Sequence, residues 1–379
     1  MLNHEQEVAA FANDPYIFLL AGAGSGKTRV IVERIHFLIK IYQKPKSILA
    51  ITFTKKAAFE MKKRIAHDDV TVVTFHEYCF KLLHLDEHQI LGEDHPFSQE
   101  DLLTFSLYKT KLKKGLPPLR FKKYQHYLTE HKLMDFDDML LEALPYINMH
   151  TFEYIFIDEF QDTNMLQYHL LKAMLKKEVS CFAVGDPDQS IYAFRGANLN
   201  VIHTYIKDYQ AKVYQLTLNY RSAHHILSIA NKLIAHNPNR FDKKLMPVKE
   251  ELGTYKLIID PLLSYDLIVN SLAKMVEQPH DIAILYRFHY QVNGLRQYLA
   301  QHYLFDIKLL SMHQAKGLEF ECVILWQVEV MPDLRNNQVK DIAEERRLLF
   351  VAITRAKSHL LIFARRKSKF INELNKVLS

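Results

Sequence analysis

The sequence has little cysteine, little tryptophan and no long apolar run. Its three cysteines, Cys79, Cys181 and Cys322, lie far apart in 379 residues and form neither a disulfide framework nor a paired metal motif. This spacing favours a reducing compartment and argues against structural zinc. The uncharged stretch at residues 16–26 is much shorter than the roughly 18 residues of a membrane span, and no basic leader precedes it. We therefore expect a cytoplasmic protein without membrane contact.

The excess of one charge sign over the other is also small, because the formal net charge is only +6. Hydrophobic residues make up 49% and charged residues 24% of the chain, which is typical of globular proteins and excludes disordered, collagen-like and coiled-coil chains. The small positive excess suits a polyanionic partner without proving one. The length corresponds to two or three domains.

Short apolar runs alternate with amphipathic helical stretches, a pattern typical of α/β folds with mostly parallel sheets. We expect one series of strands at residues 17–20, 48–53, 70–74, 154–158 and 181–185, and a second at 214–218, 255–259, 282–286, 322–326 and 360–363. Between residues 85 and 134 the sequence becomes basic and helical. The expected domains are a first lobe of residues 1–84 and 135–199, a small helical insertion of residues 85–134, and a second lobe of residues 200–379.

A glycine-rich loop follows the first expected strand and leads into a helical pattern. It reads A-G-A-G-S-G-K-T over residues 21–28, and only Ala21 departs from the strict phosphate-loop pattern. Backbone N–H groups of such a loop surround phosphate oxygens, which makes its members nucleotide-binding candidates: Gly22, Ala23, Gly24, Ser25 and Gly26. Lys27 is expected to reach the terminal phosphates and Thr28 to hold Mg²⁺. The sequence thus predicts ATP and Mg²⁺ as ligands.

A second expected strand ends in two adjacent acids, Asp158 and Glu159. Successive strand side chains diverge, so the two carboxylates can take different roles. We expect Asp158 to lie on the metal side and Glu159 to act as general base on water. An acidic pair at a strand end is more often part of a solvated turn, and the upstream phosphate loop is what favours the catalytic interpretation.

The segment at residues 158–164, D-E-F-Q-D-T-N, resembles the UvrD/Rep family of superfamily-one DNA helicases. Further segments that resemble family motifs follow in the expected order, at residues 2–6, 52–58, 74–76, 185–197, 218–222, 284–287, 312–320 and 344–356. The resemblance implies two RecA-like lobes that bind ATP. It also implies roles for single residues near the nucleotide.

In the family pattern, Gln6 reads adenine, Tyr220 stacks on the base, Arg29 lies near the base and Glu319 touches the sugar. Gln189 senses the terminal phosphate, and Arg221 and Arg355 act as arginine fingers from the second lobe. For an arginine taken alone, a surface or capping role would be the commoner interpretation.

The resemblance also implies contacts to single-stranded DNA, where bases stack on aromatic rings and cations hold phosphates. The candidates are Phe53, His76, Tyr192, Phe194, Arg195 and His313. A packing role is equally consistent with Phe53, and a hydrogen-bonding role between the lobes is equally consistent with His313.

The family resemblance implies a 3′-to-5′ DNA translocase and helicase acting on single strands and on single-strand/duplex junctions. Only 22 positions separate Arg287 from Leu309, where family members carry a large extra domain, so we expect unwinding to need an accessory protein or self-association. Two alternatives remain at this point. One is a nucleotide-switched DNA-binding module without processive unwinding, and the other is an RNA-directed ATPase.

Overall fold

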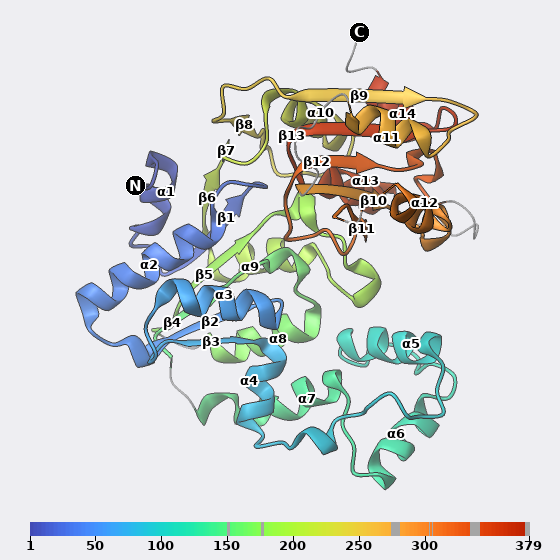
Figure 1. Ribbon diagram of the computed structural model, residues 1–379. Coiled ribbons are helices and arrows are strands. Elements are labelled where there is room, and N and C mark those ends of the chain that lie inside the picture. The colour runs from blue at the N-terminus through green and yellow to red at the C-terminus, as the bar shows by residue number, and fades with distance from the viewer. Residues whose placement is uncertain are drawn as a thin grey trace. The chain divides into compact units, whose positions relative to one another are not determined.

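The computed structural model describes residues 1–149, 152–175, 178–273, 281–302, 304, 306–333 and 342–375 (Figure 1). The chain divides into two compact units. The first holds residues 1–21, 27–186 and 192–216, and the second holds residues 22–26, 187–191 and 217–379. Two short segments of the first half of the chain, 22–26 and 187–191, therefore group with the second unit.

A parallel sheet of six strands forms the centre of the first unit. Its strands are β1 (Tyr16–Ala21), β2 (Ile48–Thr52), β3 (Thr71–Thr74), β4 (Tyr154–Ile157), β5 (Ser180–Gly185) and β6 (Lys212–Leu216). They follow the order β3-β2-β4-β5-β1-β6, and each neighbouring pair is parallel. Strands β1, β2 and β5 are buried on both faces, which explains their continuous apolar sequences. The carboxyl ends of all six strands therefore lie at one edge of this sheet.

One helix, α1 (His4–Ala10), precedes the first strand. Further helices lie between the strands: α2 (Lys27–Tyr42), α3 (Lys55–Ile65), α4 (Phe75–Leu82), α7 (Phe136–Ala143), α8 (Met165–Met174) and α9 (Asn200–Tyr209). Two of them begin directly after a strand because a threonine caps them. The Thr54 hydroxyl accepts from Ala57 N–H at 3.1 Å at the start of α3, and Thr74 caps α4 in the same way. Phe53 and His76 thus lie at the carboxyl edge of the sheet.

The helices α5 (Gln99–Thr110) and α6 (Phe121–Glu130) form the insertion, with a small core of their own. Its buried members are Phe97, Phe105, Phe121, Tyr124 and Leu128. The Lys109 side chain is fully buried, and its Nζ lies 2.6 Å from a carboxylate oxygen of both Asp135 and Asp138. Burial disfavours both carboxylates, yet Lys109 outweighs it at Asp135, whose pKa is lowered, whereas burial and the Asp135 charge raise the pKa of Asp138. This ion pair ties α5 to the start of α7.

The second unit contains a five-stranded parallel sheet. Its strands are β9 (Thr254–Ile259), β10 (Ile282–Tyr286), β11 (Lys308–Ser311), β12 (Phe320–Leu325) and β13 (Ala356–Ala364), in the order β11-β10-β12-β13-β9. A short parallel pair, β7 (Leu218–Asn219) and β8 (Met246–Pro247), lies outside it. The helices are α10 (His224–Ile234), α11 (Asp266–Ala273), α12 (Leu295–Gln301), α13 (Ile342–Ile353) and α14 (Lys369–Asn375). Trp326 is fully buried among the apolar residues of this core.

The predicted α/β class with parallel sheets is confirmed, and a helical insertion lies within the expected interval. The expected boundary at residues 199/200 is wrong. Residues 200–216 form α9 and β6, and β6 completes the first sheet by pairing with β1. Tyr205 of α9 anchors this segment, because its hydroxyl lies within hydrogen-bonding distance of Ile17 O and Cys181 O. Strand β11 was not anticipated.

Among the residues that the structure describes, no helix is both long enough and apolar enough to cross a membrane.

Replacing Lys109 by alanine should destabilise the protein, because two buried carboxylates would lose their shared cation. We expect Lys109→Ala to lower the free energy of unfolding by about 3–5 kcal/mol in urea titrations. Lys111→Ala, an exposed lysine two positions away, is the control and should change it by less than about 0.5 kcal/mol. Equal stability of the two variants would contradict a structural role for the Lys109 ion pair.

Candidate functional site

Residues 22–26 form a tight loop between β1 and α2. The backbone N–H and the hydroxyl of Ser25 both donate to Gly22 O, at 3.3 and 2.8 Å. Gly26 has a φ of +81°, a left-handed conformation that costs glycine little. The loop ends at Lys27, the first residue of α2, so it leads directly to a helix N-terminus, which favours bound anions.

Gly24 of this loop closely approaches the segment after β7. Its φ is +65°, and a Cβ placed on it would lie 2.7 Å from Asn219 Nδ2 and 2.8 Å from Arg221 Cβ. Asn219 is fully buried and donates from Nδ2 to Ala23 O at 2.6 Å, while Tyr220 N–H donates to Gly24 O at 2.9 Å. A side chain at position 24 would clash here, and Asn219 of the same unit fixes the loop. Asn219 lies in the segment 218–222, which resembles a family motif, but nothing in the local sequence indicates that it holds the loop.

In the first unit, Lys27 faces the acids at the ends of β4 and β5. Its Nζ lies 3.2 Å from Glu159 Oε1. Burial alone would lower the pKa of Lys27, but the charges of Glu159, Asp158 and Asp186 outweigh it and raise this pKa. The structure thus brings together the predicted phosphate-binding lysine and both predicted acids, with Asp186 as a third carboxylate.

Glu159 stands in an unusual backbone conformation directly after β4. Its φ is +53°, which is rare for a residue with a side chain and is found most often where function requires it. Gln161 is fully buried, donates from Nε2 to the Glu159 carboxylate and accepts from Asp186 N–H at 2.9 Å through Oε1. Gln161 therefore connects the candidate base to the end of β5, a link that sequence reasoning missed.

The donor groups at this edge fit magnesium carried by a nucleotide. Mg²⁺ in such sites takes one or two carboxylates together with phosphate oxygens and water. Asp158 is largely buried, and Thr28 follows Lys27 at the start of α2. Within the described residues, no cluster of three or more His, Cys, Asp or Glu side chains forms a complete metal cage. The set therefore suits a metal held mainly by the phosphates.

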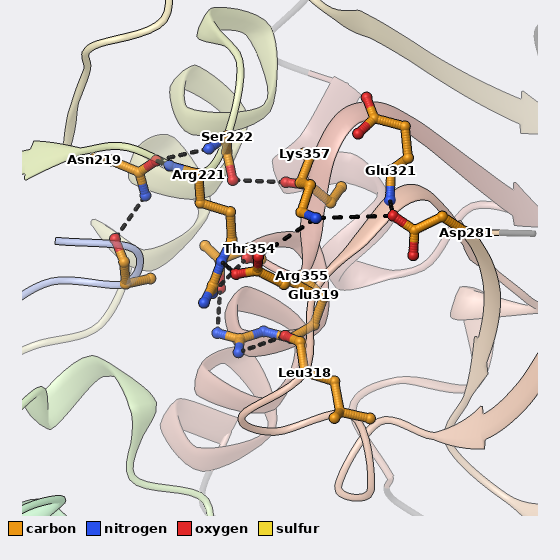
Figure 2. A network of polar contacts seen from close by, with 12 residues as sticks. Asn219, Arg221, Ser222, Asp281, Leu318, Glu319, Glu321, Thr354, Arg355 and Lys357 are labelled. Atoms are coloured by element: carbon orange, nitrogen blue, oxygen red, sulfur yellow. Dashed lines mark hydrogen bonds and ion pairs between the residues drawn. The ribbon is translucent and has the colours of Figure 1, made fainter. Parts of the chain in front are cut away.

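In the second unit, Arg221 and Arg355 converge on Thr354 (Figure 2). Arg221 Nη1 donates to Thr354 O at 3.4 Å, and Arg355 Nη2 lies 3.3 Å from Thr354 Oγ1. Arg355 is almost fully buried and also donates to Val351 O and Leu318 O, at 2.9 and 3.1 Å. These contacts fix the Arg355 guanidinium group in one orientation.

Glu319 is the centre of an ion-pair network in the same unit (Figure 2). Arg221 Nε donates to Glu319 Oε2 at 2.7 Å, and Lys357 Nζ lies 3.4 Å from Glu319 Oε1. Burial raises the pKa of Glu319, but Arg221 and Lys357 outweigh this effect and lower it. Glu319 therefore pairs with one predicted arginine finger, and its expected contact with the nucleotide sugar stays a prediction.

Of the three residues expected near the adenine base, Gln6 is held in place by local hydrogen bonds. Gln6 is buried and forms a capping box with Asn3, in which Gln6 Oε1 accepts from Asn3 N–H at 3.0 Å. Tyr220 exposes 43% of its surface, which suits stacking, and Arg29 is exposed on α2. The structure gives Gln6 a helix-capping role that the sequence did not suggest, and adenine recognition stays a prediction for all three residues.

Basic side chains of the second unit hold the segment 187–191, which contains Gln189. Asp188 accepts from Arg240 Nε and Nη2 at 2.8 and 2.7 Å, and Lys243 Nζ lies 3.4 Å away. These cations outweigh burial and lower the pKa of Asp188. Gln189 O accepts from Lys316 Nζ at 3.0 Å, and Gln189 Oε1 accepts from Arg355 Nη2 at 3.3 Å.

The structure therefore brings the predicted phosphate sensor into contact with a predicted arginine finger. Sequence reasoning missed Arg240 and Lys243, which lie outside the motifs. In the sequence they are two basic residues in a stretch without a recognisable motif, and nothing there indicates a contact with Asp188.

A groove of about 730 Å³ in the first unit brings together most of the predicted DNA-contacting residues. Phe53, His76, Tyr192 and Arg195 all line it. The Phe53 and Tyr192 rings stack, with centroids 5.3 Å apart and planes 17° from parallel. The Arg195 guanidinium lies 5.5 Å from the centre of the Phe194 ring and 5.7 Å from that of Tyr192.

The groove also contains residues that sequence reasoning missed, including Phe136 and Asp137 at the start of α7. The His76 ring contacts the Phe136 ring edge-on at 5.4 Å. Burial lowers the pKa of His76 to about 4, so this ring is neutral at pH 7 and offers a stacking face without a cation. Burial raises the pKa of Asp137 to about 6. His313 lies outside the groove, in the second unit.

Two family models match the sequence. One, described as an AAA domain, matches residues 4–195, and the other, described as the UvrD-like helicase C-terminal domain, matches residues 214–305 and 303–367. The chain is similar to a probable DNA helicase of Mycoplasma pneumoniae, with 29% identity over 95% of this chain and 83% of the relative.

It is also similar to the ATP-dependent DNA helicase PcrA of Bacillus subtilis, with 35% identity over 66% of this chain and 41% of the relative. The ATP-dependent DNA helicase Rep of Buchnera aphidicola is 32% identical over 78% of this chain and 53% of the relative. The chain thus spans about half the length of PcrA and Rep.

Replacing Gly24 by alanine should disrupt the loop, because the added Cβ meets Asn219 and Arg221. We expect Gly24→Ala to weaken binding of a fluorescent ATP analogue at least tenfold, by roughly 1.4 kcal/mol or more. Gly115→Ala is the control, since Gly115 also has a positive φ but nothing lies within 4 Å of its added Cβ. That variant should keep its ATP affinity and lose only about 1–2 kcal/mol of folding stability, because the alanine strains the backbone there. Unchanged ATP affinity in Gly24→Ala would contradict the inference that the close contact of Gly24 with Asn219 and Arg221 maintains the nucleotide-binding loop.

Proposed function

The chain belongs to the UvrD/Rep family of helicases, and we propose that it is an ATP-driven motor that moves along single-stranded DNA and separates duplexes. One observation supports this proposal above all others. The carboxyl edge of the first sheet bears both the Lys27–Glu159 pair and the aromatic groove with Phe53 and Tyr192. A motor must couple nucleotide hydrolysis to movement of the DNA strand. Placing both sites at one sheet edge brings the two processes close together.

Hydrolysis at this site would rest on positioning and charge. Lys27 leaves Glu159 and pairs with the terminal phosphates, because a triphosphate presents more negative charge than one carboxylate. Glu159, then released, accepts a proton from the attacking water. Asp158 and Thr28 would hold Mg²⁺, which would supply positive charge to neutralise the phosphates.

Arg221, Arg355 and Gln189 act on the terminal phosphate. The two guanidinium groups stabilise the negative charge that develops during cleavage. Gln189 senses whether the terminal phosphate is present through its hydrogen bond with Arg355. Because Lys27 and Glu159 belong to the first unit and both arginines to the second, a triphosphate that engages all four ties the units together in each cycle. Its cleavage releases them, and alternating grips on the strand give directed movement.

The family resemblance supports movement from 3′ to 5′. Because the interval from Arg287 to Leu309 is short, we propose that efficient unwinding requires an accessory protein or several copies on one strand. The substrates are single-stranded DNA and its junctions with duplex.

Replacing Glu159 by glutamine should separate binding from hydrolysis, because the amide keeps the shape of the side chain but accepts no proton. We expect Glu159→Gln to bind ATP and DNA like the wild type while its kcat falls by about 10²–10⁴-fold. Glu153→Gln is the matched control, because Glu153 is an exposed acid just before the same strand and pairs with Lys44 at the surface. It should keep the wild-type kcat in a coupled ATPase assay. Wild-type turnover in Glu159→Gln would remove Glu159 as general base.

Strand displacement tests the motor and its polarity together. We expect duplexes with a 3′ single-stranded tail to be opened in the presence of ATP, and duplexes with a 5′ tail to stay closed. Lys27→Ala should abolish displacement, whereas Lys46→Ala, which removes an exposed lysine, should not. Turnover stimulated by single-stranded RNA rather than DNA would favour an RNA-directed ATPase, and DNA binding without ATP-dependent displacement or stepping would favour a nucleotide-switched binding module.

A further inference from the structure

The turn that follows β10 presents aromatic rings that the site described above does not use. Phe288 and Tyr290 lie nearly parallel, with ring centroids 5.7 Å apart and planes 9° from parallel. The Arg287 guanidinium lies 4.5 Å from the centre of the Phe288 ring. Tyr290 exposes 50% of its surface, so its ring is accessible to a ligand. We call Phe288 and Tyr290 the aromatic platform.

The platform rests on a rigid support. The buried Gln291 accepts through Oε1 from Arg287 N–H and Phe288 N–H at 2.9 and 2.7 Å, which closes the turn. Its Nε2 donates to Trp326 O at 2.9 Å, and Trp326 Nε1 donates back to Gln291 O at 3.1 Å.

Arg287 is fixed from another side. It forms a two-pronged ion pair with the buried Glu345 of α13, with Nη2 2.9 Å from Oε1 and Nε 3.3 Å from Oε2. Because these bonds already order the turn, a ligand that stacks on the platform pays little additional conformational entropy.

The platform lies at the edge of the second sheet where ligands of parallel sheets bind. Strand β10 pairs in parallel with β11 on one side and β12 on the other, so the turn after β10 stands at their common carboxyl edge. The turn after β11 is directly beside it, because Met312 N–H donates to Tyr286 O at 2.9 Å. That neighbouring turn contains His313, which the family resemblance places among the DNA contacts.

We propose that Phe288 and Tyr290 are a base-stacking site through which the second unit grips single-stranded DNA. The inference rests on the proposed function, since it assigns further residues to the same substrate. Rings without charge accept any base, because every base has a flat face, which suits a motor that must step along any sequence. Arg287 is neutralised by Glu345, so it supports the Phe288 ring instead of serving as a phosphate contact.

The test measures binding of a fluorescent oligothymidine to the full chain without ATP. Tyr290→Ala should bind about tenfold more weakly, because one stacked base is lost. The slope of log affinity against log salt should stay unchanged, since no cation is removed. Tyr290→Phe should restore wild-type affinity, because the ring alone is required. The matched control is Tyr146→Ala, a tyrosine of the first unit with the same 50% exposure, which should bind like the wild type.

A second probe separates stacking from other effects. With an oligonucleotide of abasic sites, wild type and Tyr290→Ala should bind equally weakly. Wild-type affinity for oligothymidine in Tyr290→Ala would overturn the platform, as would failure of Tyr290→Phe to restore binding or an undiminished difference on the abasic strand. If the wild type itself does not bind the oligonucleotide, the proposed function fails first, so the two failures are distinguishable.

Discussion

The ion pair between Lys27 and Glu159 is the interaction on which the rest of the site depends. One ammonium group balances the carboxylates of Glu159, Asp158 and Asp186, whose charges keep it protonated despite its burial. Such a group of opposed charges is stable only while each has a partner. In the proposed function, a ligand with stronger negative charge rearranges this group, and the carboxyl edge of the first sheet thereby responds to nucleotide.

The segment 187–191 belongs to the second unit. This segment follows β5 of the first unit, yet Arg240, Lys243, Lys316 and Arg355 of the second unit contact it directly. In the proposed mechanism, a change at the phosphate that Gln189 senses reaches these basic groups through this segment, although they lie far away in sequence. We regard this short polar segment as the physical link between chemistry and movement in the proposed motor.

The sequence predicted those features that local patterns determine. Continuous apolar runs predicted strands such as β1 and β10, and the glycines after β1 predicted the loop that the structure forms. The boundary at residue 199 could not be predicted correctly, because α9 and β6 have the same α/β pattern as both units, and only pairing with β1 assigns them. Likewise, nothing local indicates that Asp188 pairs with Arg240, since 52 positions separate them and tertiary packing brings them together.

The contact between Arg221 and Glu319 has a consequence for ligand selection. At rest, the guanidinium group is already satisfied by a nearby carboxylate, which Lys357 helps to hold. A weakly charged anion such as free phosphate gains little by displacing this internal partner, whereas a polyanion gains more. For Arg221 to take its proposed role, the ligand must therefore carry enough negative charge to replace Glu319 as the partner of the guanidinium group.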